Sequence, residues 1–236
     1  MKNKLLIIIP VLNEVNNILP IIKKIFKYLY SKEKHVLFID DNSKDGTREK
    51  IYLVQKQFKK IYLIKRNRKL GIGSAHKVGL NWGFKKKYEK IITMDCDGTH
   101  DPAYINKLIK KLNKKDCHIV STNRFLKKNS LNDWTLWRKF LTFFRHKLIQ
   151  FFLDIKYDSS GAFRGYLVKC VNINDIFLAK NNSYSFFWES IFILSKKYKI
   201  KEIPIKLPGR LTGASKMRVK DIFSALLYLL KIYLKK

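Results

Sequence analysis

The stretch "IITMDCDGTHDP", residues 91–102, is the most informative part of the sequence for the fold. Its first four residues are apolar or β-prone and predict a buried strand. Acid follows at once in Asp95, Asp97 and Asp101, and Pro102 then stands at a favourable first position for a helix. A hydrophobic strand that runs into carboxylates and then into a helix is typical of an α/β sheet that binds its ligand beyond the carboxyl ends of the strands.

The same alternation of strand and helix signals continues on both sides of this stretch. Strands are predicted over 5–10, 35–41, 60–66, 90–95 and 118–125, and helices over 14–30, 47–58, part of 70–84, and 102–112. Such alternation predicts a mostly parallel, doubly wound sheet with helices on both faces. The strand ends read "PVLNE", "DDNS" and "DCDGTHD", so polar and acidic side chains are expected to gather at one edge of the sheet.

The pattern changes from residue 131 onwards. The following segments are a long aromatic and basic stretch, a loop-like stretch, a predicted helix, a predicted strand and a Gly- and Lys/Arg-rich loop, over 131–156, 157–170, 183–198, 200–208 and 209–218. No internal repeat or linker is visible. We therefore interpret 1–218 as one domain with 131–156 as an interfacial helical segment, and 219–236 as a C-terminal amphipathic helix.

The chain is strongly basic. Its 236 residues include 50 Lys and Arg against 18 Asp and Glu, which gives a net charge of +32. A hydrophobic content of 46% suffices for a sizeable core and excludes a disordered chain. The positive field attracts nucleotides, anionic lipid or nucleic acid. A nucleic-acid-binding protein is therefore an alternative class, but it leaves the strand-end carboxylates unexplained.

Three features predict a cytosol-facing protein. Cys96, Cys117 and Cys170 are odd in number and lack metal-ligand spacing, which favours a reducing compartment. The start, "MKNKLLIIIP", has too short an apolar run for a signal peptide and is interpreted as a first strand. No window reaches the run of about 18 uncharged apolar residues that a membrane span requires.

The acid pair predicts a metal site. Where the backbone turns after the strand, Asp97 can reach a divalent cation while Asp95 contacts the cation indirectly or a ligand hydroxyl. Carboxylate oxygens suit Mg²⁺ or Mn²⁺, which keep waters and bind substrate phosphates. Asp40 and Asp41 at the neighbouring strand end support this interpretation, and His100 is expected to orient the loop more than to bind metal.

Five motifs occur in a set order and spacing. They read "IIIPVLNE", "VLFIDDNSKDGT", "RKLGIGSAHKVGLNWG", "MDCDGTHDP" and "SGAFRGY". As a set they resemble the family 2 glycosyltransferases with the GT-A fold, and among these most closely the dolichol-phosphate or polyprenyl-phosphate mannosyltransferases. The resemblance covers roughly residues 3–218 and implies a GT-A (Rossmann-like) domain over nearly the whole chain.

The resemblance implies a role for individual residues at the donor site. The nucleotide-sugar would lie against Pro10, Asn13, Glu14, Asp40, Asp41 and the Gly71 loop, and Asp95 and Asp97 would hold the metal and the diphosphate. Some family members complete the metal shell with a Gln or Ser two residues after the second Asp. Here that position is Thr99, a weaker ligand, and Gly98 replaces the family's Leu, so the third metal ligand is unassigned.

The resemblance also implies residues for the acceptor and for catalysis. Arg124, Arg210 and Lys216 match cations that would bind the acceptor's phosphate or the leaving diphosphate, and Arg164 falls in another of the motifs. Glu189 is the candidate general base if the acceptor is a sugar hydroxyl. The residue that follows it is Ser, where hydroxyl-using relatives often have Asp, which favours a phosphate acceptor. The alternative for Glu189 is a structural acid.

These observations imply a metal-dependent inverting glycosyltransferase. It would move a hexose onto a polyprenyl or dolichyl phosphate at the cytosolic face of a membrane. The leading candidate for the hexose is mannose, donated by GDP-mannose. A UDP-sugar donor such as UDP-glucose, or a saccharide hydroxyl as acceptor, is the alternative. The aromatic and basic segment 134–153 and the helix 219–236 are expected to rest peripherally on the membrane, and no nucleic acid is expected as partner.

Overall fold

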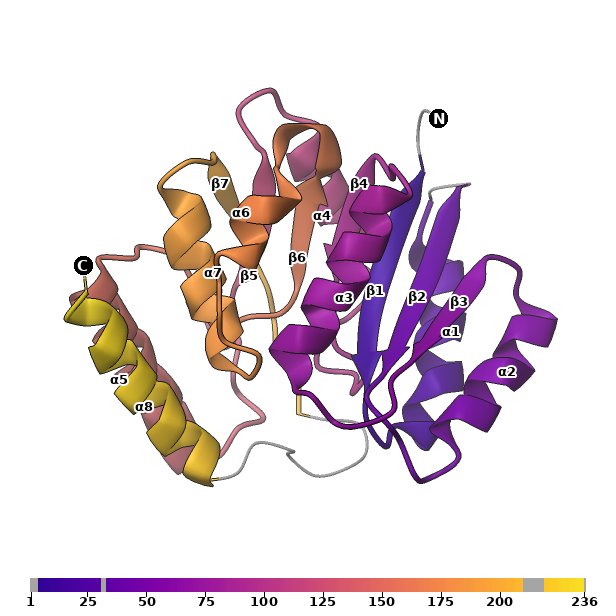
Figure 1. The fold of residues 1–236 in the computed structure, drawn as a ribbon, viewed down its shortest axis with the longest axis horizontal. Helices are drawn as coiled ribbons and strands as arrows, with labels where there is room; N and C mark the ends of the chain where they lie inside the picture. Colours follow the sequence, from indigo (N-terminus) through magenta and orange to yellow (C-terminus); the bar gives the residue numbers. More distant parts are fainter. Residues whose placement is uncertain (1–3, 31–32, 210–218, 236) are drawn as a thin grey trace.

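The structure, a computed structural model, describes residues 4–30, 33–209 and 219–235. In these residues one sheet has the strand order β3-β2-β1-β4-β6-β5-β7, with helices on both faces (Figure 1). The strands are β1 Leu5–Val11, β2 Lys34–Asp40, β3 Ile61–Lys65, β4 Lys90–Thr93, β5 Ile119–Asn123, β6 Arg164–Leu167 and β7 Ile200–Pro204. The helices are α1 Val15–Tyr28, α2 Thr47–Gln57, α3 Ile72–Lys85, α4 Tyr104–Leu112, α5 Leu136–Leu153, α6 Ile173–Phe177, α7 Ser185–Ser195 and α8 Val219–Tyr233, with a 3₁₀ turn at Val168–Cys170.

The parallel part of the sheet brings the predicted strand ends together. β1 pairs in parallel with both β2 and β4, so that Val11 lies opposite Asp40 and Ile8 lies opposite Thr93. The strands are continuous apolar runs because both faces of the sheet are covered, and Ile8 and Ile9 are fully buried. The loops after β1, β2 and β4 therefore leave the sheet at the same edge.

The chain departs from the prediction at β6. Residues 157–170 are loop-like in sequence, but Arg164–Leu167 form a strand that pairs antiparallel with both β4 and β5. Gly165 explains the misleading signal, because a Cβ there would come within 2.9 Å of side chains of Ile92, Val120 and Leu112. The sequence shows a turn-forming residue where tight packing against α4 requires the absence of a side chain. The short helix α6 is also absent from the prediction.

The remaining helices match the predicted segments. α1 and α4 cover one face of the sheet, and α3, α6 and α7 cover the other. α5 lies within the predicted 131–156 segment and runs beside α8, with the rings of Phe152 and Tyr233 5.0 Å apart (Figure 1). The boundary predicted at residue 218 lies outside the described residues. None of the described helices is both long enough and apolar enough to cross a membrane.

Candidate active site

A cavity of about 170 Å³ opens at the carboxyl ends of β1, β2 and β4. Its walls come from the loops after these strands, the start of α3, the residues before α7 and the first turn of α8. The lining residues are Pro10, Val11, Leu12, Glu14, Asp41, Lys69, Gly71, Ile72, Ala75, Asp95, Cys96, Asp97, Ser183, Tyr184 and Asp221. Six of the predicted site residues thus share one cavity: Pro10, Glu14, Asp41, Gly71, Asp95 and Asp97.

The loop after β4 is built to present Asp97. One carboxylate oxygen of Asp97 accepts hydrogen bonds from the backbone N–H of Thr99 at 3.1 Å and from its hydroxyl at 2.6 Å. Gly98 between them has a φ of 84°, a conformation that glycine adopts without strain. Both departures from the family motif thus have a local purpose, since Gly98 makes the turn and Thr99 orients Asp97.

His100 holds the other acid of the pair in place. Its Nδ1 accepts a hydrogen bond from the backbone N–H of Asp95 at 2.9 Å, and its ring packs against Phe163. Burial, partly offset by the charge of Asp97, lowers the pKa of His100 to about 4, so the imidazole is neutral at pH 7. The nitrogen that faces Asp95 is therefore occupied, and His100 orients the loop.

The donor atoms at this edge suit a divalent cation that also binds phosphate. Asp95 and Asp97 both line the cavity. No group of three or more His, Cys, Asp or Glu that could enclose a metal occurs in the part of the chain that the structure describes. Mg²⁺ and related ions are commonly held by one or two carboxylates together with waters and substrate phosphates. The site therefore fits an ion that the nucleotide diphosphate helps to coordinate.

The loops after β1 and β2 interlock. Asn13 adopts a positive φ of 53°, and its side-chain oxygen accepts a hydrogen bond from the backbone N–H of Lys44 at 2.8 Å. Its own N–H donates to the hydroxyl of Ser43 at 2.9 Å. Asn13 is absent from the cavity lining, so it supports the wall that Pro10 and Glu14 form.

Asp40 and Asp41 have separate tasks. Asp40 is fully buried, forms an ion pair with Arg48 and accepts a hydrogen bond from the backbone N–H of Ser43 at 3.1 Å. Its carboxylate is thus occupied within the protein and it does not line the cavity, in contrast to the predicted donor-binding role. Asp41 does line the cavity, and it also fixes the loop before α3.

The loop before α3 is held from both sides. Asp41 accepts hydrogen bonds from the backbone N–H groups of Leu70 at 3.0 Å and of Gly71 at 3.1 Å, and it pairs with Arg66 at 3.1 Å. Gly71 has a φ of 97°, and a Cβ there would lie 2.4 Å from the carbonyl oxygen of Asn182. Only glycine permits this contact, which brings the residues before α7 to the cavity.

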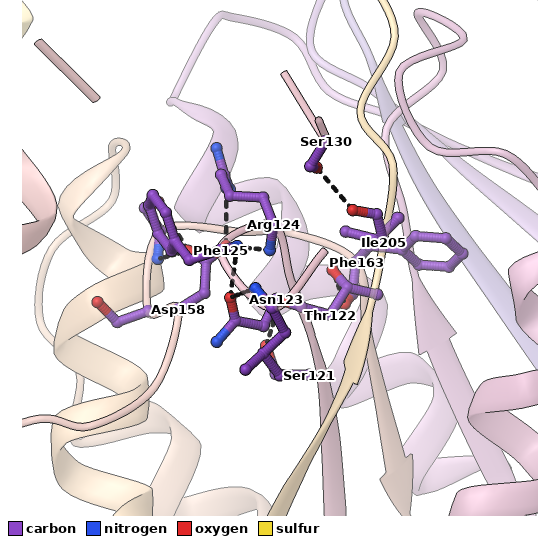
Figure 2. A network of polar contacts seen from close by, with 12 residues as sticks. Ser121, Thr122, Asn123, Arg124, Phe125, Ser130, Asp158, Phe163 and Ile205 are labelled. Carbon is purple, nitrogen blue, oxygen red and sulfur yellow. Dashed lines mark hydrogen bonds and ion pairs between the residues drawn. The ribbon is translucent and has the colours of Figure 1, made fainter. Parts of the chain in front are cut away.

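Arg124 belongs to a buried polar network at the end of β5 (Figure 2). Its Nε donates to Asp158 at 2.7 Å and its backbone N–H donates to the same oxygen at 3.1 Å. Burial acts to raise the pKa of Asp158, but the charge and hydrogen bonds of Arg124 outweigh burial and lower it. Arg145 on α5 adds a second cation, and burial together with Arg124 lowers its pKa to about 10. Arg124 does not line the described cavity.

Arg164, which falls in the "SGAFRGY" motif, is not placed to bind a phosphate. Its side chain is 1% exposed, and its guanidinium donates to the hydroxyl of Ser190 at 2.9 Å and to the carbonyl oxygens of Ser159 at 2.8 Å and Phe187 at 2.7 Å. These contacts connect β6 to α7. The guanidinium N–H groups of Arg164, which could otherwise bind a phosphate, donate to other groups of the protein.

Glu189 also differs from its predicted catalytic role. It is 3% exposed and does not line the cavity. Its carboxylate accepts hydrogen bonds from the backbone N–H groups of Lys180 at 2.8 Å and Asn181 at 2.9 Å, and from the hydroxyl of Tyr228 at 2.8 Å. Glu189 is therefore a structural acid, which is the alternative role that the sequence analysis gives for it. Arg210 and Lys216 lie outside the described residues.

Sequence reasoning missed four polar residues of the cavity wall. They are Lys69, Ser183, Tyr184 and Asp221. Ser183 and Tyr184 line the cavity because Gly71 and Gly73 permit close contact with the backbone of 182–183. Asp221 arrives because the first turn of α8 reaches the cavity. These are contacts between distant segments, and no local pattern in the sequence marks them.

Comparison with known proteins agrees with this architecture. A family model described as glycosyl transferase family 2 matches residues 6–172. The chain belongs to this family. This confirms the family and the glycosyltransferase activity predicted from the motifs.

Two relatives of this family 2 glycosyltransferase align over most of its length. The polyprenol monophosphomannose synthase of Mycolicibacterium smegmatis is 25% identical over 94% of this chain and 83% of its own length. The undecaprenyl-phosphate mannosyltransferase of Micrococcus luteus is 26% identical over 91% of this chain and 87% of its own length. Both names contain the polyprenyl-phosphate and mannose chemistry that the motifs imply.

A solved structure shows the same fold. Glucosyl-3-phosphoglycerate synthase from Mycobacterium tuberculosis, in complex with Mn²⁺, UDP and glucosyl-3-phosphoglycerate, superposes with a TM-score of 0.68. The match covers 98% of this chain and 80% of that chain, at 12% sequence identity. The predicted GT-A fold of the family 2 glycosyltransferase is thereby confirmed.

Proposed function

We propose that this family 2 glycosyltransferase transfers a mannosyl group from a nucleotide-sugar, GDP-mannose first, to a polyprenyl phosphate. The observation that carries the proposal is the cavity at the carboxyl edge of the sheet, where Asp95 and Asp97 face the loop that Asp41 holds. The names of the two mannosyltransferase relatives support the choice of sugar and acceptor.

The chain's own residues bind and orient the donor in this proposal. Asp41, Lys69 and the Gly71 loop would contact the base and ribose, and Pro10 and Glu14 form the facing wall. Asp95 and Asp97 would hold Mg²⁺ or Mn²⁺ against the diphosphate. Such an ion, when bound, neutralises the negative charge that develops on the leaving nucleoside diphosphate.

A lipid-phosphate acceptor agrees with the structural role of Glu189, whose carboxylate is buried and does not line the cavity. A phosphate monoester is largely ionised at pH 7 because its second pKa is about 6. One of its oxygens would form the new bond to the anomeric carbon while the bond to the diphosphate oxygen breaks, and the electron pair stays on the diphosphate. This displacement inverts the anomeric centre and requires no proton transfer. Arg124 and Arg145 are the described cations proposed to attract the acceptor phosphate, with Arg210 and Lys216 proposed from the motif.

The outer faces of α5 and α8 are proposed to rest on the cytosolic membrane surface where such an acceptor would be found. The exposed apolar side chains of the two helices are Leu136, Trp137, Phe140, Leu141, Phe143, Phe144 and Phe151, and Ile222, Phe223, Leu226, Leu227, Leu230 and Tyr233. Lys147 on α5 and Lys220 and Lys231 on α8 are exposed around them, and Lys139 on α5 is half-buried. An apolar face bordered by lysines is typical of helices that lie in an anionic membrane interface.

A donor panel tests the proposal. The full chain is incubated with Mn²⁺ or Mg²⁺, GDP-mannose, UDP-glucose or other nucleotide-sugars, and undecaprenyl phosphate in detergent or vesicles, and the lipid-linked product is measured. We expect mannosyl-phosphoryl lipid from GDP-mannose. Product only from a UDP-sugar would replace the donor, and product only with a saccharide hydroxyl would overturn the lipid-phosphate acceptor.

A further inference from the structure

The inner face of α8 reaches the donor cavity. Asp221, Ala225, Tyr228, Leu229 and Ile232 are the less exposed positions of this helix, spaced so that they share one side. Asp221 lines the cavity, and Tyr228, two turns further on, donates its hydroxyl to Glu189 at 2.8 Å. The opposite side of the same helix carries the apolar residues that the proposed function assigns to the membrane. One helix therefore connects two surfaces.

Glu189 continues this connection to the cavity wall. Besides Tyr228, it accepts hydrogen bonds from the backbone N–H groups of Lys180 and Asn181. The residues that follow, Asn182 and Ser183, pack against α3, where the carbonyl oxygen of Asn182 accepts a hydrogen bond from the N–H of Ser74 at 3.0 Å. The segment 180–184 thus carries Ser183 and Tyr184 into the cavity from an anchor that α8 completes.

The link joins the half-buried Tyr228 to the buried Glu189. Burial, together with the hydrogen bond and charge of Glu189, raises the pKa of Tyr228, so its hydroxyl remains the donor and the carboxylate remains the acceptor. The Tyr228 ring lies 5.7 Å from that of Trp188, next to Glu189 on α7. By contrast, Leu229 is the described side chain of α8 that is buried in the core, at 4% exposure. Because α8 buries little surface against the core, docking of its outer face on a membrane is expected to stabilise its packed position.

We propose that Tyr228 is a positioning residue that couples docking of α8 on a membrane to the affinity of the donor cavity, through Glu189 and the segment 180–184. This inference rests on the proposed function for the nature of the docked surface. Because coupling between two binding events is reciprocal, a membrane that tightens nucleotide binding must itself be bound more tightly when nucleotide is present.

The test compares two tyrosine variants of the full chain. Tyr228→Phe removes the hydroxyl that reaches Glu189 and keeps the ring. Tyr198→Phe is the matched control, because Tyr198 also donates its hydroxyl to a carboxylate, that of Asp175, at the opposite end of α7 from the cavity. The dissociation constants of GDP and of UDP with Mn²⁺ are measured by calorimetry, without vesicles and with vesicles of phosphatidylcholine and phosphatidylglycerol. Flotation measures vesicle binding, and thermal unfolding checks the fold.

We expect vesicles to tighten nucleotide binding to the wild type and to Tyr198→Phe by about three- to tenfold, the effect of about 0.7 to 1.4 kcal/mol. Tyr228→Phe should float with the vesicles yet show no such tightening. In turnover assays its KM for the donor should rise while kcat changes little. The proposal is overturned if Tyr228→Phe keeps the vesicle effect, if Tyr198→Phe loses it equally, or if the wild type shows none. The nucleotide-binding and flotation measurements need neither the sugar nor the lipid phosphate, so they remain informative if the proposed transfer reaction fails.

Discussion

Asp97 is the residue on which metal-held donor binding is expected to depend most, because its carboxylate is buried and oriented by Thr99. Asp97→Asn keeps an oxygen that can accept from Thr99, so the loop should keep its shape while the charge is lost. A loss of about 3 kcal/mol in transition-state stabilisation corresponds to about 100-fold slower turnover with Mn²⁺ or Mg²⁺. Steady-state assays with and without metal measure the effect.

The control for Asp97 removes a carboxylate from the surface. Asp116 pairs with Lys201 at 2.7 Å and is half-exposed, so Asp116→Asn should alter turnover by less than about twofold. Full metal-stimulated turnover in Asp97→Asn would contradict the role of the acid pair.

His76 makes stability depend on pH. The side chain is 1% exposed and lies between Phe186 and Phe187, and burial, followed by the charges of Arg164 and His100, lowers its pKa to about 3. The unfolded chain has a pKa of about 6.5 there, so it binds a proton that the folded chain excludes. The resulting stability is complete above about pH 6.5 and is lost as the pH falls towards 3. At pH 5 the loss is about 2 kcal/mol.

Urea unfolding at a series of pH values measures this slope. We expect the free energy of unfolding of the wild type to fall between pH 6.5 and 5, and to fall less steeply in His76→Phe, where His100 still contributes. The slope is compared instead of the absolute stability, because the larger Phe ring can itself change packing. Equal slopes in the two proteins would show that His76 does not titrate as its burial requires.

At the scale of single elements, the outer face of α8 can be separated from its inner face. Phe223 and Leu227 are each 66% exposed, so changing both to Ser should leave the fold and nucleotide binding in solution intact. Fully burying one such side chain contributes about 1.5 to 3 kcal/mol. The double variant should therefore bind anionic vesicles at least about tenfold more weakly in flotation. Leu53→Ser on α2, 52% exposed and at the far end of the molecule from α8 (Figure 1), is the control and should bind as the wild type does.

The elements that sequence predicted well are those whose pattern reports burial. β1 and β2 are apolar runs because both faces of the sheet are covered, and helices such as α1 bury a regular stripe. β6 was missed because its strand conformation depends on contacts with residues in other parts of the chain. Gly165 makes room for Leu112, and Arg164 satisfies the carbonyl groups of Ser159 and of Phe187 on α7. A local pattern cannot reveal either reason.

The same limit explains which site residues were predicted. Asp41, Asp95 and Asp97 stand at strand ends, where the topology alone brings them to one edge. Glu189 was placed by its motif, but its role depends on the backbone of 180–181 and on Tyr228, which only the folded chain brings together. Tyr184 and Asp221 reach the cavity by the packing of whole elements and carried no signal.

At the scale of the whole molecule, charge is divided between two functions. Five acids line the cavity, Glu14, Asp41, Asp95, Asp97 and Asp221, within a chain whose net charge is +32. Acids at this position would repel a nucleotide unless a cation lies between them, whereas the surrounding Lys residues attract anionic surfaces from every side. The basic charge is therefore expected to act mainly on the membrane.

Salt should separate the electrostatic part of membrane binding from the apolar part. Raising the ionic strength from about 0.1 M to about 1 M shortens the screening length from about 10 Å to about 3 Å. Binding to phosphatidylglycerol-containing vesicles should then weaken steeply, since each Lys or Arg near the surface contributes about 1 kcal/mol at low salt. At low salt, binding to pure phosphatidylcholine vesicles should be weaker than binding to phosphatidylglycerol-containing vesicles. It should change little as the ionic strength rises, because it depends on the apolar faces of α5 and α8. If both kinds of vesicle bind equally at low salt, the net charge does not contribute to docking, and the apolar faces of α5 and α8 must account for all of it.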